Sequence, residues 1–341
     1  MKKVTSLILA LVISISFVSC GATSDNDGTP KDNSNSVSAW EQLTDKEKEF
    51  YEKKDDEGFT IQKDTGYVYC DAKGYEDDYG WTYGDEGIVI AYWFGTDEIV
   101  HIPDEIDGKE VVNVANLPLY RYGDTNDEYH NLGRTFNVKE AYFPEKFGNV
   151  HCAFGKSLEK IELPKTQTEI AHGGFKSTNI KSFECPEELI TIQDDAFLRC
   201  SSLESVTFND KLETIGEAAF SYCDKLTTIS LPNSVIQIDK YAFNGCKSLE
   251  EIKLPKNLKT ISEDMFGHCE SLKKLDIPDS VVEIGEAAFF CCGTIDIYIP
   301  SSVITIKEDA FKNCDKVTIH GTSGSYAEKY AKENGIEFIA E

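Results

Sequence analysis

The chain has 341 residues and a formal net charge of −26 at pH 7, because 60 acidic residues outweigh 34 lysines and arginines. A surface this acidic repels the phosphates of nucleic acids and anionic membranes, so neither is an expected partner. The charge is typical of a soluble domain outside the cytoplasm, and it leaves basic or cation-bridged partners open.

The first segment, residues 1–20, is predicted to be a lipoprotein signal peptide. Two lysines precede fifteen uncharged residues, Val4 to Val18, a run that is short for a membrane span and typical of a signal-peptide core. The small residues before Cys20 resemble a bacterial lipoprotein cleavage site, although Phe17 stands where leucine is usual. The resemblance implies that the Cys20 sulfur carries lipid and begins the mature chain. An ordinary secretory signal is the alternative.

Residues 21–38 have almost no apolar side chains and are expected to form a flexible tether. Residues 39–84 are expected to form an N-terminal helix followed by a cap rich in tyrosine and glycine. Thr44 and Glu47 make a capping box near the start of a predicted helix over 40–56. The tyrosine-rich part is expected to pack over the open first turn of the next segment.

From residue 85 to residue 320 the chain repeats a unit of about 23 residues. A phenylalanine marks most of these units and recurs every 21 to 23 residues, at Phe154, Phe175, Phe197, Phe220, Phe243, Phe266, Phe289 and Phe311. A fixed period in the twenties predicts a solenoid, in which one supersecondary unit stacks on copies of itself. We therefore expect one elongated domain with long, shallow surfaces rather than a deep catalytic pocket.

The unit is clearest in residues 225–247, which read KLTTISLPNSVIQIDKYAFNGCK. Its Leu-x-x-Ile-x-Leu start alternates as a half-buried strand does, and Pro232 ends the strand because proline cannot continue the ladder. Val-x-x-Ile predicts a second short extended segment, and Ala-Phe-x-x-Cys predicts a helical or 3₁₀ turn. Stacked units pair their strands about 4.8 Å apart, so the phenylalanines are expected to form an internal column.

The repeated pattern, Leu-x-x-Ile-x-Leu-Pro-x-x-Val-x-x-Ile-x-x-x-Ala-Phe-x-x-Cys, resembles the BspA-type leucine-rich repeat of bacterial surface proteins. The resemblance covers roughly residues 85–341, of which 321–341 are similar to the family's usual C-terminal cap. It implies a leucine-rich repeat solenoid of short parallel strands, capped at both ends. Within the cap, Ser325 can begin a short helix and Gly335 can end it.

The cysteines follow the same period. Eleven cysteines in an exported chain would usually indicate disulfides. Six of them, however, stand three residues after a repeat phenylalanine, at Cys200, Cys223, Cys246, Cys269, Cys292 and Cys314. Side chains that point the same way give poor bridging geometry, so these are expected to be small buried hydrophobes.

No cofactor, metal or enzymatic activity is predicted. The sequence has no phosphate-binding, dinucleotide-binding, zinc-protease or serine-hydrolase motif, and no paired Cys-x-x-Cys or ligand-spaced histidines. Cys152 and Cys269 each follow a histidine, but both occupy core positions of the repeat, so neither pair is a predicted catalytic site.

The first candidate binding site is the outward row of the strand face, where one residue of each unit lies between two buried positions. This row varies while the inward row is constant: His101, Tyr142, Glu162, Glu184, Thr207, Ser230, Lys253, Asp276, Tyr298 and Thr318. The six residues predicted to contact a ligand are His101, Tyr142, Glu162, Lys253, Asp276 and Tyr298. A solvated face without a ligand is the alternative.

The second candidate site is an insert at residues 117–135, which replaces the expected Ala-Phe-x-x-Cys of an early unit. Its tyrosines Tyr120, Tyr122 and Tyr129 are of the kind that interfaces use. Long inserts in repeat proteins often lie at binding faces.

The resemblance implies a bacterial surface protein that binds a protein on host or neighbouring cells, as adhesins do. Its domain would lie outside the cytoplasm and meet the membrane only through the lipid on Cys20. A carbohydrate-binding surface protein stays open because residues 67–93 are rich in tyrosine and tryptophan. A structural envelope component without a specific ligand stays open too. An enzyme built on residues 39–84 is disfavoured, since that segment is too short for an active site.

Overall fold

The computed structural model describes residues 38, 40–56, 58–64, 67–73, 86–93, 98–114, 138–145 and 156–341. The predicted signal peptide with Cys20, nearly all of the tether and the insert at 117–135 lie outside these residues. The chain divides into two compact units, Met1–Tyr142 and Phe143–Glu341. The boundary falls inside the segment predicted from sequence as a single solenoid.

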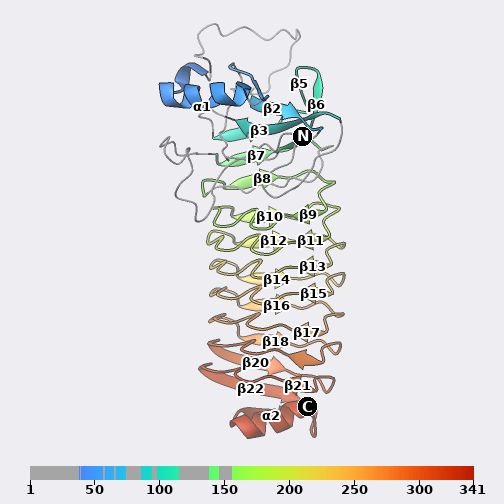
Figure 1. The fold of residues 1–341 in the computed structure, drawn as a ribbon. Helices are drawn as coiled ribbons and strands as arrows, with labels where there is room; N and C mark the ends of the chain where they lie inside the picture. Colours follow the sequence, from blue (N-terminus) through green and yellow to red (C-terminus); the bar gives the residue numbers. More distant parts are fainter. Residues whose placement is uncertain are drawn as a thin grey trace, which may run out of the picture. The chain divides into compact units, whose positions relative to one another are not determined.

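The first unit contains a 3₁₀ turn, a helix and two small sheets. The turn η1 (Trp40–Gln42) precedes α1 (Asp45–Asp56), which lies where the capping box at Thr44 predicts a helix. One sheet has the order β1-β2-β3-β6-β5, with the bounds Thr60–Ile61, Tyr67–Asp71, Ile88–Trp93, Lys109–Val114 and Glu105–Ile106 (Figure 1). In addition, β4 (Ile99–His101) pairs in parallel with β7 (Glu140–Tyr142).

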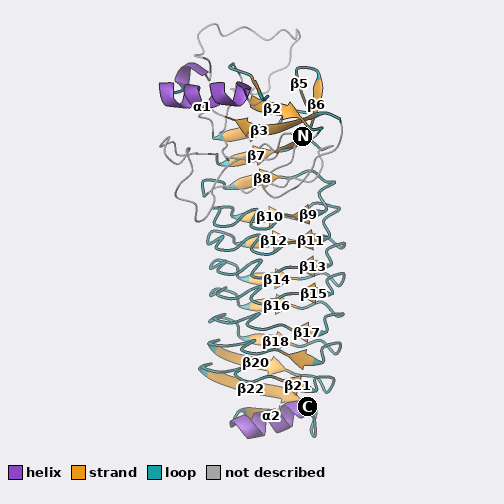
Figure 2. Ribbon diagram, in the orientation of Figure 1, coloured by secondary structure: helices purple, strands orange, loops and turns teal. Residues whose placement is uncertain are grey.

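The second unit is a stack of turns with two short strands each (Figure 2). The first strands are β8 (Lys160–Glu162), β10 (Ser182–Glu184), β12 (Ser205–Thr207), β14 (Thr228–Ser230), β16 (Glu251–Lys253), β18 (Lys274–Asp276), β20 (Thr294–Tyr298) and β22 (Lys316–Gly321). The second strands are β9 (Glu169–Ile170), β11 (Thr191–Ile192), β13 (Thr214–Ile215), β15 (Gln237–Ile238), β17 (Thr260–Ile261), β19 (Glu283–Ile284) and β21 (Thr305–Ile306). Strands of neighbouring turns pair in parallel, which confirms the predicted solenoid.

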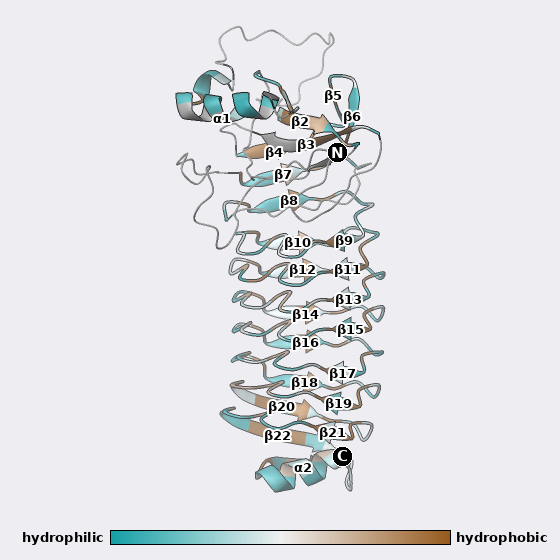
Figure 3. Cartoon of the chain, viewed as in Figure 1, coloured by the Kyte–Doolittle hydropathy of each residue, from teal (hydrophilic) through white to brown (hydrophobic). Residues whose placement is uncertain are grey.

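Alternation along each first strand sets which side chains enter the core. The β16 residue Ile252 is buried while its two neighbours in the strand are exposed, and β18 shows the same pattern around Leu275. Along β20, hydrophobic and hydrophilic residues alternate in the same way (Figure 3). A strand with one buried and one solvated face produces this period of two.

The core of the second unit is the predicted column of phenylalanines. The rings of Phe197, Phe220 and Phe243 are fully buried and nearly parallel, with centroids 5.0 and 5.6 Å apart. The column continues through Phe266 and Phe289 at 6.0 and 5.5 Å. Burial of each side chain is worth about 1.5–3 kcal/mol, so the column is a main source of stability.

The repeat cysteines lie beside this column as free thiols. Each thiol donates to the carbonyl of the phenylalanine in the preceding turn. Thus Cys223 Sγ lies 3.3 Å from Phe197 O, and Cys246 Sγ lies 3.2 Å from Phe220 O. The ladder cysteines therefore serve as small buried side chains with a weak donor, as predicted.

The third side of each turn differs from the prediction. Ala-Phe-x-x-Cys was expected to form a helical or 3₁₀ turn, and some bonds fit that pattern, since Cys223 N donates to Phe220 O. Residues such as Ala218 (φ 52°) and Tyr222 (φ 58°), however, are left-handed and interrupt any helix. Their backbone instead bonds to the next turn, where Tyr222 N donates to Asn244 O over 2.8 Å. The reason is that a ladder between turns satisfies backbone groups that a short helix would leave unpaired.

The C-terminal cap is α2 (Tyr326–Asn334) followed by β23 (Glu337–Ala340). As the sequence predicts, Ser325 is the N-cap, and its hydroxyl accepts from Glu328 N. Gly335 ends the helix in the left-handed conformation with φ 67°. Strand β23 pairs in parallel with β22, so the cap continues the sheet of first strands by one strand.

Candidate binding site

Parallel pairing aligns one outward residue near the end of each first strand into the predicted row. Ser230 pairs with Lys253, Asp276 pairs with Tyr298, and Tyr298 pairs with His320. Lys253 and Asp276 occupy the same position in the adjacent strands β16 and β18, which also pair. Because successive strands are about 4.8 Å apart, these side chains form one continuous row.

The row residues predicted to bind fall into two groups, one in each unit. In the first unit, His101 and Tyr142 pair across β4 and β7, and their rings stack with centroids 4.6 Å apart. The Tyr142 hydroxyl also bonds to the Glu140 carboxylate. In the second unit, Glu162 is exposed at the end of β8, several turns from the set Lys253, Asp276 and Tyr298. That set therefore offers the largest contiguous group of predicted residues.

One predicted member of the row is wrong. Thr318 was placed after Tyr298, but the register pairs Thr318 with Asp296 and brings His320 beside Tyr298. Thr318 also pairs with Glu337 of β23 and is only 6% exposed. The reason is that β22 lacks the proline that marks the strand end in most turns, so the row position lies two residues further along.

A groove of about 1250 Å³ lies over this part of the strand face. Its lining includes Lys253, Asp276, Tyr298, His320 and Glu341. The volume exceeds the 300–1000 Å³ that is usual for small-molecule sites, so the groove is better matched to a protein surface. His320 and Glu341 were not predicted, because they join the groove only through the register of the last turns.

The groove carries charges of both signs. Lys274 Nζ lies 3.6 Å from Asp276, and His320 Nδ1 lies 2.8 Å from Glu341. Lys253 is exposed and has no ion-pair partner within the described part of the chain. Exposed ion pairs contribute little to stability, so these groups are available to reorganise around a charged partner.

The described ranges contain neither a metal-binding cluster nor a membrane-spanning helix. No group of three or more His, Cys, Asp or Glu is placed there to hold a metal ion. Likewise, none of the helices described is long and apolar enough to cross a bilayer. The predicted insert tyrosines Tyr120, Tyr122 and Tyr129 lie outside the described residues, so that candidate stays a prediction.

Comparison with known proteins gave one family match. A model of the BspA type leucine rich repeat region, with six copies, matches residues 134–249 and 213–328, which together span more than half of the chain. No curated protein matches the chain.

Several solved structures resemble this one. A leucine-rich repeat protein from Bacteroides ovatus is 23% identical with a TM-score of 0.46, and the match covers 65% of this chain and 63% of that one. A leucine rich cell surface protein from Faecalibacterium prausnitzii is 18% identical with a TM-score of 0.38, covering 83% and 98%. A leucine rich repeat protein from T. pallidum is 26% identical with a TM-score of 0.40, covering 62% and 87%.

Proposed function

Because this chain belongs to the BspA-type leucine-rich repeat family, we propose that it is a surface protein whose strand face binds a protein on a host or neighbouring cell. The observation that carries the proposal is the contrast between the two rows of the first strands. Inward positions such as Ile252 and Leu275 are apolar and buried, whereas Lys253, Asp276 and Tyr298 differ in chemistry on adjacent turns. A row that packing does not constrain is free to encode recognition.

The lining of the groove supports a protein ligand with basic character. The chain carries a net charge of −26, and Asp276 and Glu341 add carboxylates to the groove. Half-buried Tyr298 provides an aromatic surface of the type that concentrates binding energy in interfaces. Such a partner would approach under electrostatic attraction and then be held by a few contacts near the groove centre.

The first test concerns those contacts. The Asp276→Ala, Tyr298→Ala double variant is expected to reduce adhesion to the cognate surface at least about tenfold, because truncated anchors typically cost more than 1 kcal/mol each. The measurement is adhesion of beads coated with the full chain to matrix proteins and cells, at increasing salt. Salt should weaken binding, since exposed charges are screened within about 10 Å at 0.1 M.

The matched control is Thr207→Ala, an exposed residue of the same row outside the groove. It should leave adhesion unchanged. Unchanged adhesion in the double variant, with the fold intact by circular dichroism, would place the binding site elsewhere. If the wild type adheres to no protein or cell, a glycan ligand or a purely structural role becomes the better explanation.

The second test concerns attachment to the cell. We propose that the protein is exported and held at the envelope by lipid on Cys20, since a charge-free core and small residues precede that cysteine. Cys20→Ser should abolish incorporation of labelled fatty acid and release or mislocalise the protein. Cys291→Ser, which changes a half-buried thiol near the end of the solenoid, should keep the label. A wild type that takes up no fatty acid would rule out the lipoprotein.

A further inference from the structure

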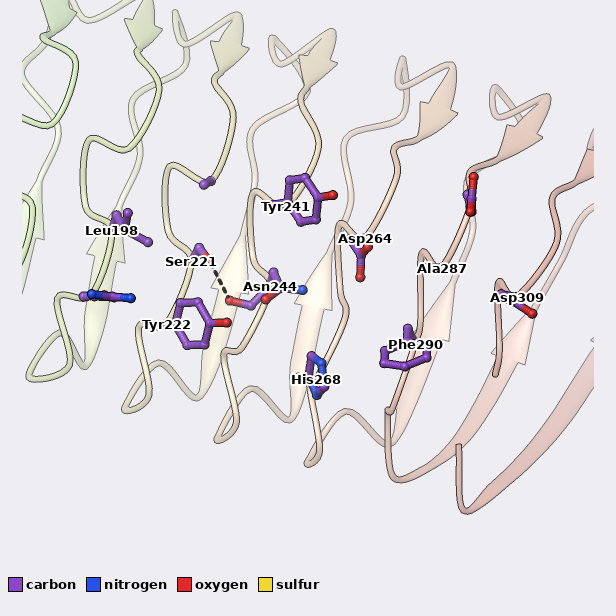
Figure 4. Close-up of a pocket in the computed structure, with 13 residues that line it drawn as sticks. Leu198, Ser221, Tyr222, Tyr241, Asn244, Asp264, His268, Ala287, Phe290 and Asp309 are labelled. Carbon is purple, nitrogen blue, oxygen red and sulfur yellow. Dashed lines mark hydrogen bonds between the residues drawn. The ribbon is translucent and has the colours of Figure 1, made fainter. Parts of the chain in front are cut away.

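A second groove, of about 520 Å³, lies on the third side of the turns rather than on the strand face. Its lining residues come from successive turns and include Tyr222, Tyr241, Asn244, Asp264, His268 and Phe290 (Figure 4). None of them lines the strand-face groove. The volume is within the range of small-ligand sites, so this groove differs in scale from the first.

Two lining residues of this groove, Asn244 and Asp264, converge over Gly267, and this part of the groove is here called the notch. A Cβ placed on Gly267 would lie 2.5 Å from Asn244 Nδ2 and 2.5 Å from Asp264 Oδ1. Both polar groups therefore occupy the space that a side chain at position 267 would need, and glycine there lets them converge. The next turn places Phe290 at the equivalent position, one residue after the repeat phenylalanine, so the notch is specific to this turn.

The Asn244 side chain is the most unusual feature of the notch. The residue is only 7% exposed, and its amide has no hydrogen-bond partner among the described residues. Its backbone is fixed, because Ser221 Oγ donates to Asn244 O over 3.0 Å, as Figure 4 marks. The amide lines the groove rather than being sealed from solvent, so it can exchange hydrogen bonds with water or with a bound group.

Asp264 is the second polar group. Burial raises the pKa of its carboxyl, the charges of Glu263 and Glu286 add to this, and His268 opposes it. No ion pair neutralises Asp264 within the described part of the chain. The notch thus offers a carboxylate acceptor beside an amide that both donates and accepts.

Aromatic rings form the walls on either side. Tyr222 is 43% exposed, and its ring packs on Gly245, where a Cβ would lie 2.7 Å from Tyr222 Cδ1. On the opposite side, the His268 and Phe290 rings meet edge to face with centroids 5.4 Å apart. Tyr241 is a further aromatic residue of the lining. Its hydroxyl donates a hydrogen bond to the Glu263 carboxylate over 3.0 Å, which fixes the ring.

From this arrangement we infer that the groove above Gly267 binds a neutral sugar residue. A pyranose ring presents adjacent hydroxyls, each able to donate and to accept, together with an apolar C–H face. Its hydroxyls can donate to Asp264 and exchange hydrogen bonds with the Asn244 amide, while the C–H face packs on an aromatic wall. This site is separate from the proposed protein-binding face, so the two can be tested independently.

The alternatives fit less well. A lysine or arginine side chain could pair with Asp264, but it has no acceptor for the Asn244 amide. An acidic sugar or a phosphate would lie against Asp264 and Glu286, which also lines the groove, and like charges disfavour such a complex. A neutral ligand with donors and acceptors satisfies both groups.

The test uses the full chain and methyl glycosides of glucose, galactose, mannose and N-acetylglucosamine in saturation-transfer NMR and calorimetric titration. At least one glycoside is expected to bind the wild type. Asp264→Asn should weaken that binding about tenfold or more, since a hydrogen bond to a charged group is lost. Asparagine tolerates the left-handed backbone at Asp264 (φ 50°), so the fold should survive.

Gly267→Ala provides a second, steric test, because its methyl group would lie 2.5 Å from Asn244 Nδ2 and from Asp264 Oδ1, should displace both groups and should therefore abolish binding. The matched control is Asp195→Asn, which has a similar left-handed backbone (φ 58°) at the equivalent position of an earlier turn, outside the groove. The inference is overturned if no neutral glycoside binds, if both notch variants bind as the wild type does, or if only a sialylated glycoside or a lysine-rich peptide binds.

Discussion

Phe243→Ala is expected to lower the free energy of unfolding by about 3–5 kcal/mol, the usual cost of truncating a fully buried aromatic side chain. Phe243 is fully buried, and its ring stacks between Phe220 at 5.6 Å and Phe266 at 6.0 Å. The cavity would open in the middle of the column, with ordered turns on both sides and little room to collapse. Small domains are stable by only about 5–15 kcal/mol, so much of the total would be lost.

The measurement is urea-induced unfolding monitored by circular dichroism. Hydrogen exchange then shows which turns lose stability. Each turn contacts mainly its neighbours, so protection should fall first in the turns next to Phe243. Lys253→Ala, on the exposed row, should change stability by less than about 0.5 kcal/mol. A loss below about 1 kcal/mol for Phe243→Ala would show that the column is not the core of the stack.

Alkaline pH is expected to destabilise the folded protein, because the ladder thiols ionise more easily in the unfolded chain. Burial raises the pKa of Cys200 to about 11 and that of Cys246 to about 12, from an ordinary thiol value of 9.0. Because the folded state keeps these thiols protonated, their stabilising contribution is complete below pH 9 and is lost as pH rises toward 11 and 12. At pH 11 the two thiols together would cost about 5 kcal/mol.

Two measurements check this expectation. Circular dichroism should show unfolding that begins above pH 9, and Cys246→Ala should shift it to higher pH. At pH 8, alkylation of Cys246 should be about 1000-fold slower in the native protein than in denaturant, because its thiolate is that much rarer. Equal rates in the two states, or a disulfide between Cys246 and either neighbouring ladder cysteine, would contradict the buried ladder.

The stack was predicted well from the sequence because each position of the repeat unit recurs in several turns. Phe243 has equivalents in the turns before and after it, so the column did not depend on reading any one unit correctly. The same redundancy fixed the two strands of each turn. The C-terminal cap was predictable for a different reason, since Ser325 and Gly335 are strong local signals for a helix start and end.

The missed features depend on contacts that no single unit contains. Tyr222 and Tyr241 have positive φ, which their residue type does not indicate. His320 reaches the strand-face groove only because β22 continues past Thr318 without a proline. The notch likewise needs Asn244 of one turn beside Gly267 of the next, at positions that vary between units. Such sites are formed by the pairing register between neighbouring turns, and the residue pattern of a single unit does not reveal that register.

The constant offset of one repeat between paired strands, as between Thr228 and Glu251, has a genetic consequence. A recombination event that copies or removes the coding segment of one whole turn leaves every remaining turn in register with its new neighbour. The stack would lengthen or shorten by about 4.8 Å, and the phenylalanine column would stay continuous. An event in a turn next to β16 or β20 can also bring a different outward residue beside Lys253 or Tyr298. Duplication of turns can therefore vary the recognition surface while leaving the core unchanged.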